Sequence, residues 1–261
     1  MGLFSSIRSK AGMSKSESGW NSESSADEKD SHGAGTFLAT SNLDVHALGY
    51  DTNQALTGKT LENIAVRRVE SGETEYVSMR QKKSSNSCAL VRPSDPDRTL
   101  ISTIYRFGPG RHPTMRLVPA NARVSVDAAL LDKSVPGAAV DVRSRSFVSR
   151  AQVLDTPRGA FQWRYGSREE RKACRADSLL VMERVGGGRV AQLVRNEELR
   201  TPGTVRDSGG NGGRLMMDLH EWEKADKGSV AEVEAFVVAG CLLMLKREAD
   251  RFIDNTIAAV V

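Results

Sequence analysis

Hydrophobic residues are most concentrated near the end of the chain, where residues 235–245 include no charged side chain. A helix that is apolar all round is surrounded by protein or by lipid. Ser229 and Glu232 match the capping box that starts many helices. Crossing a bilayer takes about 20 apolar residues, so this shorter run predicts a core helix over 229–252, without a transmembrane span. Gly240 would let a neighbour pack close to the helix backbone. A helix of an ordinary α/β layer is the alternative.

Before this helix, short β-type runs alternate with turn residues. Ser71-Gly72 and Gly186-Gly187-Gly188 separate the runs of two expected hairpins. We expect strands at 64–69, 74–79, 88–91, 100–107, 114–118, 140–148 (or 140–154, as the alternative), 161–165, 179–184, 189–195 and 215–219. Many short strands followed by one apolar helix predict a mainly β protein. Its closed antiparallel β-barrel, or strongly curved sheet, would wrap around the C-terminal α-helix.

The segment Glu234-Ala235-Phe236-Val237-Val238-Ala239-Gly240-Cys241-Leu242-Leu243 resembles the end of a tubby or phospholipid scramblase chain. Both belong to the tubby C-terminal-like superfamily, together with the LURP-one-related proteins. The resemblance is at the level of the fold and covers roughly residues 50–255. It implies a barrel threaded by the apolar helix. Tubby domains bind phosphoinositide head groups and scramblase-like proteins associate with membranes, so it also implies a lipid-binding, peripheral membrane protein.

Residues 9–36 are rich in serine, glycine and acidic residues, and we expect a disordered tail over residues 1–40. The barrel domain would occupy 41–255, and 256–261 would form a C-terminal tail. The first six residues match the N-myristoylation pattern, with Gly2 as the acceptor. One acyl chain binds membranes only marginally, so a second contact is expected from Arg8, Lys10 and Lys15. The alternative is an ordinary flexible tail whose Gly2 is never acylated.

Basic residues are concentrated between Asp141 and Arg175, where the sequence has nine positive and four negative side chains. Arginine forks suit phosphate groups. We therefore predict head-group binding by six residues of this region: Arg143, Arg145, Arg164, Arg168, Arg171 and Lys172. The alternative is a solvated barrel exterior, with some arginines paired to neighbouring acids.

A glycine-rich segment is a second candidate for anion binding, because glycine loops can offer backbone N–H groups to phosphate. It consists of Gly210, Asn211, Gly212, Gly213 and Arg214. A strand is expected after it, where the P-loop pattern requires a helix. A flexible turn is the alternative.

Composition limits the kinds of partner, cofactor and cellular compartment to expect. The 261 residues are 39% hydrophobic, which is enough for a sizeable core, and the net charge of +4 favours anionic partners. Three distant cysteines argue against a disulfide framework and for a reducing, cytoplasmic compartment. The four histidines are scattered, so we predict neither a metal site nor a cofactor. Nucleic acid is not an expected partner, because the usual helix-in-groove and exposed-aromatic motifs are missing.

Together, these features predict a non-enzymatic, membrane-associated binding protein that recognises anionic phospholipid head groups at the cytoplasmic face of a membrane. The alternative is a soluble scaffold or regulatory module that binds protein partners and no lipid. An enzyme is the third hypothesis, because distant residues can meet in a fold.

Overall fold

The structure is a computed structural model that describes residues 37–49, 63–82, 85–106, 111–132, 134–145, 149–223 and 227–260. The chain divides into two units, Met1–Ser31 and His32–Val261, and every described residue belongs to the second unit. The predicted tail contacts at Gly2, Arg8, Lys10 and Lys15 lie outside the described residues.

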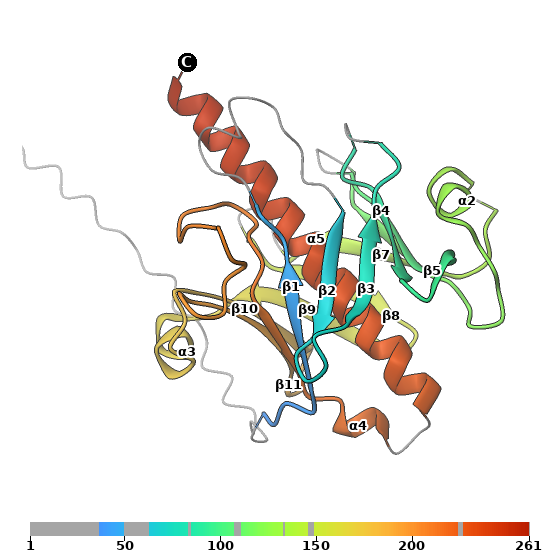
Figure 1. Cartoon of the computed structure of the whole chain (residues 1–261), viewed down its shortest axis with the longest axis horizontal. Coiled ribbons are helices and arrows are strands. Elements are labelled where there is room, and N and C mark those ends of the chain that lie inside the picture. Colours follow the sequence, from blue (N-terminus) through green and yellow to red (C-terminus); the bar gives the residue numbers. More distant parts are fainter. Residues whose placement is uncertain are drawn as a thin grey trace, which may run out of the picture. The chain divides into compact units, whose positions relative to one another are not determined.

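The twelve strands of the described residues form a closed antiparallel barrel (Figure 1). Each strand pairs with its neighbours in the chain, and β12 pairs with β1 to close the barrel. The strands are β1 (Ser41–His46), β2 (Ile64–Arg68), β3 (Thr74–Met79), β4 (Cys88–Arg92), β5 (Asp95–Ile104), β6 (Thr114–Leu117), β7 (Ala138–Ser144), β8 (Gln152–Thr156), β9 (Gly159–Tyr165), β10 (Ser178–Arg184), β11 (Arg189–Arg195) and β12 (Arg214–Met217). Three short helices, α2 (Val126–Leu131), α3 (Arg168–Ala173) and α4 (His220–Glu223), lie between strands or after β12.

The barrel encloses the long helix α5 (Lys227–Val260), which runs behind β1, β2 and β3 in Figure 1. Every residue from 233 to 246 is buried. On β1, burial alternates along the strand, as expected for a strand with one face inward. The inward side chains of the strands and the apolar side chains of α5 form one core cluster. The predicted fold class is therefore confirmed, and the α/β-layer alternative is wrong.

Two buried ionic contacts fix α5 against the wall of the barrel. Near the start of the helix, Glu234 accepts hydrogen bonds from Ser41 of β1 (2.7 Å), Arg68 of β2 (2.7 Å) and the Tyr76 hydroxyl of β3 (2.8 Å). Glu248 lies 14 residues further along the helix, a distance of about 21 Å at 1.5 Å per residue. There, Arg195 of β11 donates to both carboxylate oxygens of Glu248. Directional bonds at both points help to fix the rotation and the depth of a helix whose apolar contacts are non-directional.

The helix is longer than predicted. It begins at Lys227, so Ser229 lies inside the first turn, and the capping box at this position is wrong. It also continues to Val260 through most of the predicted tail 256–261. No glycine or proline follows Gly240 to end it, and Phe252 and Ile253 pack against Ala249.

Two strand predictions also need correction. The run expected from 140 to 148, or on to Leu154, consists of two strands, because β7 turns back and pairs with β8 through Val142 and Leu154. β1 was not predicted, because only Leu43 and Val45 of its six residues are apolar. Pairing with β2 and β12 on either side holds this strand in place.

Helix α5 also has to be considered as a possible membrane-spanning segment. By length and composition, Gly228–Thr256 is able to cross a bilayer, although its apolar run was predicted to be too short. However, 72% of its most apolar window is buried within the protein. A core helix passes the same test of length and composition, so this finding is weak evidence for a membrane span.

Candidate functional site: an arginine groove

Two adjoining cavities have volumes of about 460 Å³ and about 540 Å³, and the second lies beside the second half of α5. They share Ser149, Arg150, Tyr165 and Ser178, and we call them together the arginine groove. Each volume falls within the range of ligand pockets. Among the described residues, the lining includes the two carboxylates of Asp177 and Glu248 and nine arginines: Arg145, Arg150, Arg164, Arg171, Arg195, Arg200, Arg206, Arg247 and Arg251.

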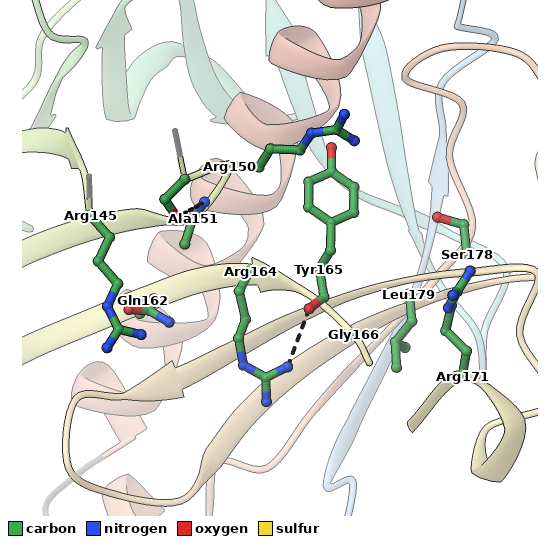
Figure 2. A pocket seen from close by; sticks show the side chains of 11 residues that line it. Arg145, Arg150, Ala151, Gln162, Arg164, Tyr165, Gly166, Arg171, Ser178 and Leu179 are labelled. Atoms are coloured by element: carbon green, nitrogen blue, oxygen red, sulfur yellow. Dashed lines mark hydrogen bonds between the residues drawn. The ribbon is translucent and has the colours of Figure 1, made fainter. Parts of the chain in front are cut away.

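The first cavity is lined by arginines from four segments (Figure 2). Arg145 follows β7, Arg150 precedes β8, and Arg171 belongs to α3. The guanidinium of Arg150 lies 5.9 Å from the centre of the Tyr165 ring, a cation–π distance. Within the described part of the chain, none of these three arginines has a carboxylate within 4.0 Å. No carboxylate of the described residues therefore compensates these three charges at close range.

Arg164 differs from its neighbours, because two carboxylates neutralise it. Its Nη1 lies 2.7 Å from Glu170, and its Nη2 lies 2.9 Å from Glu183. The hydrogen bond to Glu170 raises the pKa of Arg164, and the same contact lowers the pKa of Glu170 to about 2. Arg189 also pairs with Glu170. This network joins β9, β10, β11 and α3, so Arg164 builds the wall of the groove.

The second cavity is lined by arginines of β11, of the segment after it, and of α5. Arg195 is buried against Glu248, and Arg200 lies 2.6 Å from Asp177. Arg247 and Arg251 are four residues apart, and hence neighbours on the helix surface. Burial, and to a smaller extent the charge of Arg251, lower the pKa of Arg247 to about 10. Positive charge at Arg247 is thus already unfavourable before a ligand binds.

Three of the six predicted head-group residues line the groove, namely Arg145, Arg164 and Arg171. The other three, Arg143, Arg168 and Lys172, are exposed and are not among its lining residues. Arg143 lies 3.5 Å from Asp141 on the outer surface of β7.

Six arginines of the groove were not predicted as site residues: Arg150, Arg195, Arg200, Arg206, Arg247 and Arg251. They are far apart in the sequence and meet because the barrel closes around α5. One local signal was available. The spacing of Arg247 and Arg251 places both on one face of a helix, next to its charged end.

The glycine-rich segment is buried against β1 and does not form an open loop. Gly212 donates its N–H to the Ala47 carbonyl (2.8 Å), and the Gly213 carbonyl accepts from Val45 (2.9 Å). A Cβ on Gly212 would lie 1.8 Å from the Val45 oxygen, so this glycine allows close packing. Arg214 is paired with Asp44 at 3.0 Å. These contacts favour a role for the segment in packing against β1 over a role as a phosphate-binding loop.

Two further members of that segment have specific neighbours. Gly210 lies against α5, where a Cβ would be 2.4 Å from the Leu245 carbonyl oxygen. Asn211 is buried, accepts a hydrogen bond from Arg195 (3.1 Å) and lines the arginine groove. Asn211 is therefore the one residue of the predicted phosphate loop placed to support Arg195 from inside the protein.

Over the described ranges of the chain, no three His, Cys, Asp or Glu side chains gather closely enough to hold a metal ion. Comparisons with protein-family models, with curated proteins and with solved structures give no match to this chain.

Proposed function

We propose that the protein binds anionic phospholipid head groups in the arginine groove. The observation that carries this proposal is the charge of the lining, in which nine arginines accompany two carboxylates. Arg145, Arg150, Arg171 and Arg251 have no carboxylate within 4.0 Å among the described residues. Like charges held together at the edge of a low-dielectric barrel repel each other. A bound phosphate relieves that repulsion and accepts paired hydrogen bonds from guanidinium groups.

A lipid is favoured as the source of the phosphate by the sequence at the start of the chain. The Gly2 acylation pattern and the basic side chains Arg8, Lys10 and Lys15 would hold the protein at an anionic cytoplasmic surface. A head group would then meet the groove at high local concentration. The resemblance to tubby domains implies the same class of ligand.

The direct test is sedimentation of the full chain with phosphatidylcholine vesicles, with and without a phosphoinositide. The variant Arg150→Gln with Arg251→Gln removes two charges from the groove. The control Arg123→Gln with Arg143→Gln removes two charges that are exposed and lie outside it. At roughly 1 kcal/mol for each charge near an anionic surface, the groove variant should bind about tenfold to thirtyfold more weakly. The control should change binding less than about threefold.

Three other outcomes would count against the proposal. An equal loss in both variants would mean that general surface charge drives binding. Saturable binding of a soluble inositol phosphate without vesicle binding would assign the groove to a free phosphate compound. A folded parent protein that binds neither would leave the scaffold hypothesis as the better explanation.

A further inference from the structure

A separate cavity of about 390 Å³ lies at the other end of α5, between the first turns of the helix and the barrel strands β5 and β6. We call it the apolar groove. Its lining is mainly hydrophobic and includes Leu100, Leu117, Phe161, Ala231 and Phe236. Glu232, on its border, and Arg251, in the arginine groove, are 19 residues apart in the helix. At 1.5 Å per residue this is about 28 Å, so the two grooves are distinct sites.

Two buried aromatic rings form the inner surface of the apolar groove. Phe161 and Phe236 are almost completely buried, and their ring centres lie 5.6 Å apart in an edge-to-face arrangement. Leu100 and Leu117 are only partly buried, although both pack against the core. The groove is therefore an apolar surface beside a preformed aromatic base, at the mouth of a β-barrel, where ligand pockets commonly occur.

The charged border of the groove is nearly balanced, with one exception. Arg92 is paired with Glu75, Arg158 is paired with Glu232, and Asp95 is paired with Arg123, which lies outside the groove. Arg98 donates to the Ala120 carbonyl and has no carboxylate within 4.0 Å among the described residues. Arg98 is thus the cation whose charge is left for a ligand. The chemistry that matches is one apolar chain with a single anionic end.

We propose that the apolar groove binds a single-chain fatty acid, with its carboxylate at Arg98 and its chain packed between α5 and the strands β5 and β6. Thr99, beside Arg98, also lines the groove, and its buried hydroxyl has no hydrogen-bond partner among the described residues. The groove lining therefore includes a second polar atom that the described residues leave without a partner. This site is independent of head-group binding in the arginine groove.

The test is calorimetric titration of the delipidated full chain with myristate and, separately, with tetradecanol, which has the same chain without the charge. We expect one myristate per protein. Arg98→Gln should weaken myristate binding about tenfold and change tetradecanol binding less than about twofold, because only the acid uses the guanidinium. Arg143→Gln, an exposed arginine outside the groove, is the control for net charge.

A second variant tests the position of the chain. Ala231→Phe adds a ring to a partly buried lining residue and should weaken both ligands about tenfold or more. Ala258→Phe makes the same change at an exposed position of the same helix and should have no effect. If Ala231→Phe fails to fold, the comparison of myristate with tetradecanol in Arg98→Gln decides whether the groove binds the fatty acid.

Several results would overturn the inference. One is the absence of saturable binding of either ligand. Another is unchanged binding in both Arg98→Gln and Ala231→Phe. Loss of myristate binding in Arg150→Gln with Arg251→Gln would place the ligand in the arginine groove. Binding that appears only after Gly2→Ala would assign the apolar groove to the protein's own acylated N-terminus.

Discussion

Gly240 of α5 lies against Trp163 of β9 so closely that a Cβ on residue 240 would be 2.5 Å from the indole Nε1. Trp163 is 1% exposed, and its Nε1 has no hydrogen-bond partner among the described residues. The largest side chain of the barrel interior therefore packs directly on the helix backbone. A glycine at residue 240 is what permits this contact.

Gly240→Leu should destabilise the protein, because neither the helix nor the buried indole has room for a larger side chain. Overfilling a packed core costs about 1–3 kcal/mol and sometimes more. We expect a lower melting temperature and a lower urea midpoint. Gly188→Leu is the matched control, because Gly188 is exposed, with open space around it. If both variants melt at the temperature of the parent, Gly240 does not require the close packing described above.

Glu234 should be much more important for stability than Glu232, two residues away on the same helix. Glu234→Ala leaves Arg68 and the Tyr76 hydroxyl without their buried acceptor, and breaking a buried pair costs about 3–5 kcal/mol. Glu232 pairs with Arg158 at the surface, where such a pair contributes about 0–1 kcal/mol. Chemical denaturation of Glu234→Ala and Glu232→Ala measures the difference. Similar losses in the two variants would argue against a special role for the buried contact.

The carboxyl of Glu170 predicts a loss of stability in acid. Its pKa is lowered to about 2, chiefly by hydrogen bonding to Arg164, from the ordinary value of 4.5. A carboxylate with a lowered pKa in the folded state stabilises the protein above its unfolded pKa, and this contribution disappears as the pH falls. The free energy of unfolding contributed by Glu170 should therefore decline between about pH 5 and about pH 2.

Glu170→Gln should lower the free energy of unfolding at pH 7 by on the order of 2 kcal/mol, and the difference from the parent should shrink towards pH 2. Denaturation at several pH values measures this directly. Glu197→Gln, an exposed glutamate without an ion pair among the described residues, serves as the control. A constant difference between Glu170→Gln and the parent from pH 7 to pH 2 would contradict the assignment.

Gly2→Ala should release the protein from membranes in cells, because it removes the predicted site of acylation. A single acyl chain and the basic residues Arg8, Lys10 and Lys15 would act together. Fractionation and mass spectrometry of the parent N-terminus are the measurements. Anchoring through Gly2 is wrong if the parent carries no acyl group, or if Gly2→Ala remains fully on membranes.

The sequence by itself determined the elements whose pattern is local. Hairpins β2–β3 and β10–β11 were predictable because turn residues separate their apolar runs. Helix α5 was predictable as a core helix because an apolar run without a polar face has to be covered. From these elements the barrel class followed, since many short strands and one apolar helix leave few ways to bury all the apolar surface.

Only the tertiary structure decided the place of β1, the turn between β7 and β8, and the membership of the arginine groove. β1 has two apolar residues in six, and pairing with β2 and β12 holds it in the sheet. The arginine groove collects Arg150, Arg200 and Arg251 from separate segments. Charge along a chain does not reveal which arginines have carboxylate partners. Arg164 and Arg171 look alike in the sequence, but folding brings Glu183 and Glu170 to the first and leaves the second available to a ligand.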